Sequence, residues 1–243
     1  MGLSRIWRMN FLSRLALACC GVVLAGADAL AARPFMTDDA RITTAESCQL
    51  ESWTRRYRDR TENWALPACN PTGNFEITAG GGHFHADGLP HSSDQVLQGK
   101  TLLRDLTTND WGWGLAFGVV RHVGTQPGPN QFGAQYAYAP FSVSMFDDRV
   151  VVHTNLGWTR ENRTHRNLAT WGVGVEYWMH PRLMLIAEAF GDNRQKPFVQ
   201  TGLRFSLIPG LLQIDATRGA QPNGIGQTTW TSFGLRYTPD RLF

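Results

Sequence analysis

Residues 111–120 alternate between large apolar and small side chains, and this period of two restricts what the segment can form. One face carries Trp111, Trp113, Leu115, Phe117 and Val119, whereas the other carries glycine, alanine and valine. Such alternation predicts a β-strand with one apolar face. A strand that spans a membrane needs about 9–11 residues, with one face toward lipid and one toward a polar lumen. A soluble sandwich or a lipocalin-like barrel also alternates, so this pattern by itself leaves both architectures open.

The same period recurs along the chain in short segments that turn residues separate. Eleven segments read clearly as strands, and a twelfth is expected in 61–69, although Pro67 interrupts it. Bacterial barrels use even numbers of strands. The prediction is therefore an all-β, antiparallel, up-and-down transmembrane β-barrel of about twelve strands, with ten as the alternative. The eleven segments are 46–57, 73–85, 94–104, 111–121, 132–146, 149–160, 167–178, 182–191, 197–207, 211–218 and 229–238.

Aromatic residues gather near the ends of these segments, where the interfacial girdles of a membrane barrel lie. Short and longer connections alternate between the segments, as expected for tight periplasmic turns and longer outer loops. We therefore expect the rims to carry Trp111, Trp158, Trp171, Tyr177, Trp178, Trp230 and Tyr237.

The N-terminal residues have the three parts of a secretory signal peptide. Three arginines precede an apolar run over 15–27, and residues 27–31 offer two small-x-small cleavage sites. The run is shorter than the ~20 apolar residues that a membrane-spanning helix needs. The expected organisation is a signal peptide at 1–31 and an outer-membrane β-barrel at 32–243. The expected location, after cleavage, is the bacterial outer membrane.

The charge of the chain gives no support to one class of partner, nucleic acid. The formal net charge is +3, and removal of the predicted leader leaves 20 basic and 19 acidic residues, or +1. Lys100 and Lys196 are the only lysines, and the arginines form no basic stripe. A nearly neutral chain of this kind gives no reason to expect nucleic-acid binding.

The chain ends in Phe243, after the amphipathic segment at 229–238 and Pro239. A terminal phenylalanine after such a strand is the usual mark by which outer-membrane barrels are recognised for assembly. The expected partners are therefore outer-membrane lipid and the barrel assembly machinery, with a small-molecule solute if the barrel transports.

Three short motifs are similar to a family of outer-membrane barrels. They are RPFMTDDA at 33–40, followed by QLE at 49–51; NP at 70–71, followed by NFE at 74–76; and HTNLG at 153–157. This pattern resembles the barrels named for the meta-pathway of phenol degradation, which are also labelled simply as transporters. The resemblance implies an outer-membrane β-barrel, and the phenol label implies passage of small aromatic compounds.

Continuing the alternation places a set of polar and charged residues on the lumen side. Charge on the lipid face costs roughly 2–4 kcal/mol for Arg or Lys at mid-membrane, so the lumen is the favourable location. These residues either form a selectivity lining for a solute or form an ion-pair network that fills a narrow barrel. The set is Glu51, Glu76, Lys100, Arg104, His153, Asn155, Glu176, Glu188, Arg204, Asp215 and Arg236.

Two sequence clusters could bind a metal, but simpler interpretations are favoured, and we predict neither a metal nor a cofactor. Residues 37–39 (Thr-Asp-Asp) are expected to cap or turn the chain at the periplasmic rim. Residues 83–87 (His-Phe-His-Ala-Asp) are expected to form a solvated loop end. Cys48 and Cys69 are the only cysteines after the leader, and the oxidising periplasm permits a structural disulfide between them.

The favoured function is a narrow channel for the uptake or efflux of small solutes, including hydrophobic or aromatic ones. The alternative is a non-transporting barrel with a filled lumen. An enzyme that acts on lipids is less favoured, because no serine is placed beside His153 by the sequence. The prediction is therefore that the chain is not an enzyme.

Overall fold

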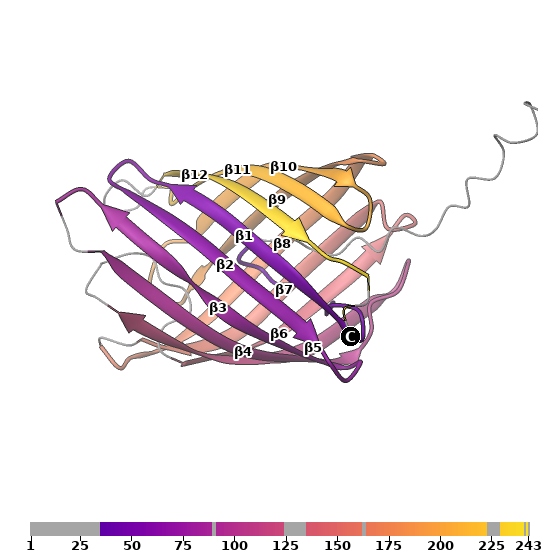
Figure 1. Ribbon diagram of the computed structural model, residues 1–243, viewed down its shortest axis with the longest axis horizontal. Coiled ribbons are helices and arrows are strands. Elements are labelled where there is room, and N and C mark those ends of the chain that lie inside the picture. The colour runs from indigo at the N-terminus through magenta and orange to yellow at the C-terminus, as the bar shows by residue number, and fades with distance from the viewer. Residues whose placement is uncertain are drawn as a thin grey trace, which may run out of the picture.

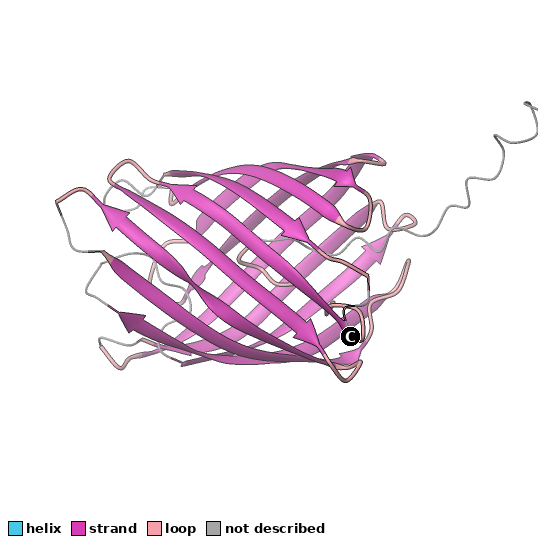
Figure 2. Ribbon diagram, in the orientation of Figure 1, coloured by secondary structure: helices cyan, strands magenta, loops and turns pink. Residues whose placement is uncertain are grey.

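The computed structural model describes residues 35–88, 91–123, 135–161, 164–222, 229–240 and 242. Within them, consecutive strands pair antiparallel and β1 pairs with β12, so that the sheet closes (Figure 1). Figure 2 shows strands and loops, without helices, in this part of the chain. The predicted barrel of twelve antiparallel strands is confirmed. The strands are β1 (Ser47–Arg56), β2 (Arg60–Asn70), β3 (Phe75–Ala86), β4 (Ser92–Arg104), β5 (Trp111–Val123), β6 (Gln135–Met145), β7 (Val150–Arg160), β8 (Asn167–His180), β9 (Leu183–Asp192), β10 (Phe198–Ile208), β11 (Leu212–Ala220) and β12 (Trp230–Tyr237).

Strand β2 is the predicted twelfth segment, and it accommodates Pro67. Pro67 pairs in register with Leu50 of β1, while on the opposite side the pairing with β3 pauses between Ala65 and Ala68. Proline has no N–H to donate, so it fits a strand only where one ladder is interrupted. Pro140 in β6 coincides with a similar pause in the pairing with β5.

The face predicted to meet lipid points outward. The five large side chains of β5 between Trp111 and Val119 are between 36% and 56% exposed. Trp158, Trp171 and Tyr237 are also exposed, as expected for residues of the aromatic girdles.

Two aromatic residues assigned to the girdles are inside the barrel instead. Trp230 is 2% exposed, because it shares the inward face of β12 with Ser232, Gly234 and Arg236. Trp178 packs against the buried cluster that contains Met184. Position near a strand end was a poor guide here, since the phase of the alternation decides which face a ring occupies.

The two ends of the barrel differ in their connections. We call the end where β1 begins and β12 ends the terminal end, and the opposite end the loop end (Figure 1). Connections at the terminal end are short, such as 181–182 and 209–211, whereas the longest ones, 124–134 and 221–229, join strands at the loop end. This asymmetry is typical of outer-membrane barrels.

Residues 35–43, here called the inner segment, lie inside the barrel. Phe35, Thr37, Asp39 and Ala40 are each no more than 4% exposed. The segment forms no strand, and its hydrogen bonds reach side chains of β3, β6, β7 and β9. The expectation that residues 37–39 turn at the rim is therefore wrong. An aqueous lumen is absent from small eight-stranded barrels, but twelve strands leave room for a stretch of chain.

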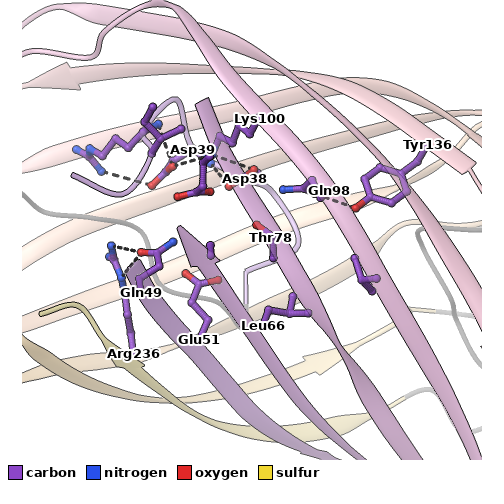
Figure 3. Close-up of a pocket in the computed structure, with 15 residues that line it drawn as sticks. Asp38, Asp39, Gln49, Glu51, Leu66, Thr78, Gln98, Lys100, Tyr136 and Arg236 are labelled. Carbon is purple, nitrogen blue, oxygen red and sulfur yellow. Dashed lines mark hydrogen bonds and ion pairs between the residues drawn. The ribbon is translucent and has the colours of Figure 1, made fainter. Parts of the chain in front are cut away.

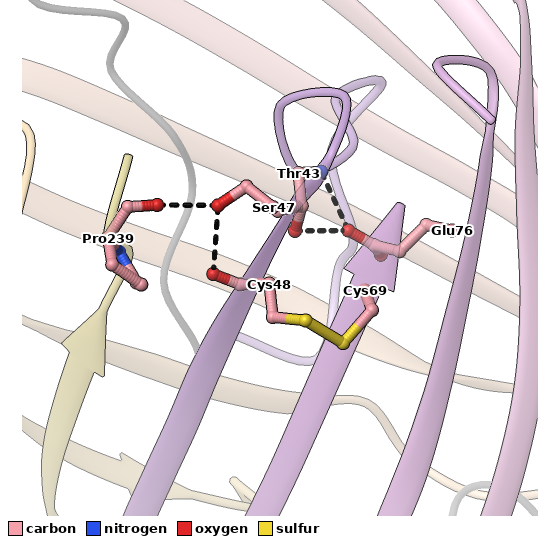
Figure 4. The surroundings of a disulfide bond; sticks show 6 residues. All are labelled: Thr43, Ser47, Cys48, Cys69, Glu76 and Pro239. Atoms are coloured by element: carbon pink, nitrogen blue, oxygen red, sulfur yellow. Dashed lines mark hydrogen bonds between the residues drawn. A yellow bond between two sulfur atoms is a disulfide. The ribbon is translucent and has the colours of Figure 1, made fainter. Parts of the chain in front are cut away.

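A disulfide joins Cys48 of β1 to Cys69 of β2 near the terminal end (Figure 4). The two residues are register partners, and their Cα atoms are 4.0 Å apart. Next to Cys48, the Ser47 hydroxyl donates a hydrogen bond to the carbonyl of Pro239, which ties the start of β1 to the chain that follows β12.

Replacing both cysteines with serine is expected to lower the free energy of unfolding by about 2–4 kcal/mol, because the unfolded chain regains the freedom that the closed loop removes. Urea titration of the refolded protein in detergent measures the effect. Wild-type protein titrated with reductant provides the control and should match the double variant. An unchanged midpoint in both would contradict a stabilising role for this bond.

Several expectations fall outside the described residues. These are the leader at 1–31 with its cleavage sites, and the terminal Phe243. Among the residues that are described, no helix has the length and apolar character needed to cross a membrane.

Candidate transport lumen

Most of the predicted lumen residues lie buried inside the barrel. Ten of the eleven are at most 8% exposed although they stand on strands that form the barrel wall. They are Glu51, Glu76, Lys100, His153, Asn155, Glu176, Glu188, Arg204, Asp215 and Arg236. The barrel wall is a single β-sheet, so its strand residues are buried only where their side chains point inward. These side chains therefore surround the inner segment.

Arg104 does not line the lumen. The pairing of β4 with β5 shifts between Leu102 and Arg104, which brings Arg104 opposite the outward-facing Trp113. Its guanidinium lies 3.8 Å from the ring centroid of Trp111 and 2.6 Å from a carboxylate oxygen of Asp110. The simple alternation that placed Arg104 inside fails because a bulge moves the following residues to the other face.

The barrel wall holds the backbone of the inner segment through side-chain acceptors. The N–H groups of Met36 and Thr37 donate to the carboxylate of Glu188, at 2.9 and 2.8 Å. The N–H of Ala40 donates to the Ser142 hydroxyl at 2.8 Å. Because buried N–H groups must find partners, these wall acceptors determine where the segment lies.

Two further wall residues complete this set of acceptors. The N–H of Asp38 donates to Asn155 Oδ1, and Asn155 Nδ2 donates back to the Asp38 carbonyl at 2.8 Å. The N–H and the hydroxyl of Thr43 both donate to one oxygen of Glu76, at 2.7 Å. Glu76 and Asn155 lie on β3 and β7, so the inner segment reaches across the lumen.

Glycines on β8 provide space for the inner segment. A Cβ atom at Gly172 would lie 2.5 Å from Thr37 Oγ1, and one at Gly174 would lie 3.5 Å from Thr37 Cβ and 3.6 Å from the Phe35 ring. Phe35 itself packs in a buried cluster with Met184. The small side chains that alternate along this strand thus accommodate the inner segment.

Charged side chains of the inner segment pair with the wall. Lys100 Nζ lies 3.0 Å from Asp38 Oδ2 and 3.4 Å from Asp39 Oδ1. The Tyr138 hydroxyl donates to the same oxygen of Asp38. Arg41, which is only 13% exposed, lies 3.6 Å from a carboxylate oxygen of Glu176.

Glu176 is the centre of a fully buried group on β6, β7, β8 and β10. Arg204 Nη1 lies 2.7 Å from Glu176 Oε1, and His153 Nε2 lies 3.5 Å from Glu176 Oε2. His153 Nδ1 is 2.8 Å from the Ser142 hydroxyl, which also accepts the N–H of Ala40. Ser142, His153 and Glu176 have no exposed surface, so no solute reaches them while the inner segment is in place.

A cavity lies beside the inner segment, against β1–β4, β6 and β12 (Figure 3). The space in it that water can occupy is about 30 Å³, which is room for about two water molecules while the inner segment is in place. One part is apolar, with Leu66, Val96 and Tyr136, whereas the other has charged groups of both signs. Arg236 there donates to Gln49 Oε1 at 2.7 and 3.1 Å, as the dashed lines show.

The loop-end half of the lumen is lined by aromatic rings. Trp53 stacks on Trp64 with centroids 5.6 Å apart, and Tyr136 belongs to the same buried cluster. A second cluster contains Tyr57, Phe190, Phe198 and Trp230, with Met36 of the inner segment packed against it. Guanidinium groups lie on two of these rings: Arg60 is 3.6 Å from the centroid of Tyr57, and Arg55 is 5.3 Å from that of Trp230.

Sequence reasoning missed several groups of this site. Gln49, Gln98 and Ser142 follow the inward phase of their strands, so the alternation itself could have found them. Arg41 and the lumen position of residues 37–39 carry no such signal, since the inner segment has no periodicity. The histidines at 83 and 85 are exposed, with His85 stacked on His91 at 4.8 Å. Among the described residues, no group of three His, Cys, Asp or Glu is arranged to hold a metal.

Solved structures share this fold. The KdgM porin superposes with a TM-score of 0.59 at 8% identity, over 79% of this chain and 99% of that one. The NanC porin gives a TM-score of 0.52 at 10% identity, over 80% and 100%. The outer-membrane protein Omp33 of Acinetobacter baumannii gives 0.50 at 7% identity, over 79% and 97%. A search among curated protein sequences finds no significant match.

A family model provides the sequence relationship. It matches residues 20–237, which is most of the chain and all twelve strands. The chain, a closed twelve-stranded barrel with the fold of outer-membrane porins, therefore belongs to the family described as Uncharacterised conserved protein UCP029691.

Proposed function

We propose that this protein is a narrow outer-membrane channel for small solutes, closed at rest by the inner segment. The observation that carries the proposal is the way in which the barrel wall binds residues 35–43 inside the lumen. Each of their hydrogen bonds to the barrel involves at least one side chain, and no strand ladder includes them. The inner segment can therefore leave the lumen without breaking a backbone hydrogen bond of the barrel.

The lumen supports passage of small rather than large solutes. Twelve strands lie between the eight of a filled barrel and the 16–18 of an open porin. Once the inner segment has left, the aromatic loop-end half and the mixed-charge wall beside the cavity suit a compact amphipathic molecule, which agrees with the aromatic solutes that the phenol-degradation resemblance implies. KdgM has been solved in complex with oligogalacturonate, so acidic sugars are the contrasting class to test.

The remaining features of the proposal concern location. The leader at 1–31 is removed on export, the barrel at 32–243 is inserted by the assembly machinery, and lipid surrounds its exposed apolar face. The short connections at the terminal end face the periplasm, and the longer ones at the loop end face outward.

A pair of glycine variants tests the closed state. Gly172→Ala places a Cβ atom 2.5 Å from Thr37 Oγ1, whereas Gly174→Ala makes only ordinary contact, at 3.5 Å from Thr37 Cβ. Overpacking costs about 1–3 kcal/mol, which corresponds to a ~5–150-fold shift toward the open state. Single-channel recording in planar bilayers should show more frequent opening for Gly172→Ala and wild-type behaviour for Gly174→Ala.

The same recordings separate the channel from a non-transporting barrel. The filled lumen of the resting state is the observation that favours this second candidate. If neither Gly172→Ala nor wild type conducts with any solute, while both migrate as folded barrels on gels, the channel proposal fails.

An enzyme that acts on lipids is not supported by the geometry, even though Ser142 lies beside His153. Such an enzyme needs its nucleophile at the lipid face, whereas Ser142 points into the lumen beneath Ala40 and is fully buried. These contacts support a role for Ser142 in holding the inner segment.

A further inference from the structure

The charges buried in the barrel are predominantly acidic. In the part of the chain that the structure describes, eight acidic and four basic side chains are buried. The acids are Asp39, Glu51, Glu62, Glu76, Asp94, Glu176, Glu188 and Asp215, and the bases are Arg55, Lys100, Arg204 and Arg236. The chain as a whole carries +3, so this excess of acid belongs to the lumen and not to the protein's overall composition.

The buried bases are largely matched by nearby acids. Arg204 is paired with Glu176, and Lys100 with the two aspartates of the inner segment. Arg55 lies 3.9 Å from Glu62. Asp39 and the partners of Lys100 belong to the inner segment, so the wall of the open lumen keeps seven buried acids against four buried bases, which is still an excess of acid.

Three buried acids, in contrast, form no ion pair within 4 Å with a basic side chain of the described residues. Glu188 and Glu76 accept hydrogen bonds from N–H groups of the inner segment. These donors are present only while the inner segment closes the lumen. Asp215 is 5% exposed, and neither of its carboxylate oxygens has a partner in hydrogen-bonding geometry. Its Oδ1 lies 2.5 Å from where a Cβ of Gly234 would stand, so the carboxylate overlies a glycine on the inner wall.

The contacts of the inner segment and of the loop-end aromatic rings indicate which kind of solute the buried carboxylates would bind. The inner segment satisfies Glu76 and Glu188 with N–H donors, and it brings the Arg41 guanidinium to Glu176. At the loop end, guanidinium groups of this chain already lie on aromatic rings inside the barrel. Aromatic faces and carboxylates both attract cations that carry N–H groups.

We propose that the open lumen selects cations and that its solutes are small organic cations of the ammonium or guanidinium class, which replace the N–H groups of the inner segment at Glu76 and Glu188. This inference rests on the proposed channel function and specifies its substrate class. Rings of acidic side chains are a general means by which pores select cations. A cleft lined by one sign of charge also raises the local concentration of counter-ions.

The test is the reversal potential of single channels in planar bilayers under a KCl gradient, with Gly172→Ala used to increase opening. We expect potassium permeability about tenfold above that of chloride, within the range by which charged clefts concentrate counter-ions. Replacing potassium with guanidinium should sustain the current, whereas galacturonate should not replace chloride as a current carrier.

Variants identify the groups responsible. Glu76→Gln combined with Glu188→Gln should lower the permeability ratio several-fold, and Asp215→Asn provides a second neutralisation if that double variant does not fold. Asp105→Asn is the control, because Asp105 is exposed on the turn between β4 and β5. Channels that conduct but prefer chloride, or whose selectivity is unchanged in every lumen variant, would overturn this inference and leave the channel in place. Absence of conductance would instead overturn the channel.

Discussion

Deletion of residues 35–43 is expected to convert a barrel that is mostly closed into one that conducts continuously. Five backbone N–H groups of this segment donate to side chains of the wall. At about 1 kcal/mol net for each hydrogen bond, the five together contribute about 5 kcal/mol to the closed state. A change of ~5.5 kcal/mol is enough to shift an equilibrium between open and closed states from 1:99 to 99:1. Single-channel recording of the refolded variant measures the change in open probability.

The deletion needs a check on folding, because it leaves Glu188 and Glu76 without these donors. Heat-modifiable migration on gels and circular dichroism should show an intact barrel, since the strand ladders do not include the deleted residues. A folded variant whose conductance equals that of wild type would contradict the role of the inner segment as the closing element.

The second large effect concerns stability. Replacing Arg204 with alanine is expected to lower the free energy of unfolding by about 3–5 kcal/mol, because it removes the nearest basic partner of a buried carboxylate. Arg204 is 1% exposed, and its guanidinium lies 2.7 Å from Glu176. Urea titration of the refolded barrel in detergent measures the loss.

An exposed ion pair on the same barrel provides the matched control. Arg104 lies 2.6 Å from Asp110, but both side chains are more than one-third exposed. Arg104→Ala should therefore cost no more than about 1 kcal/mol. If both alanine variants lost the same free energy of unfolding, burial would not be the reason why the Arg204–Glu176 pair stabilises the barrel.

The strands could be predicted from sequence because a membrane barrel imposes one rule on every strand. Each has a face toward lipid and a face toward the lumen, so the alternation gives both the element and the side on which a residue lies. Even β2 was found, through the requirement for an even number of strands. The rule fails at Arg104, because a bulge depends on the pairing of two strands and leaves no mark in either one alone.

The inner segment could not be predicted for a different physical reason. It is held by single side chains from strands far apart in the sequence, such as Glu76 on β3 and Glu188 on β9. Contacts of this kind produce no local periodicity, so residues 37–39 read only as a polar turn. The same contacts explain why lumen residues such as Asn155 were predicted individually, whereas their common role in holding the inner segment was not.

The most direct test of the closed lumen is a disulfide between the inner segment and the wall. Thr37 Cβ lies 3.5 Å from the position of a Cβ at Gly174, which is within the spacing that disulfides adopt. In the variant with Thr37→Cys and Gly174→Cys, we expect a crosslink detectable by peptide mapping, no conductance when oxidised, and channel openings after reduction. Failure of the two cysteines to crosslink in a folded barrel, or equal conductance before and after reduction, would contradict the closure of this channel by its inner segment.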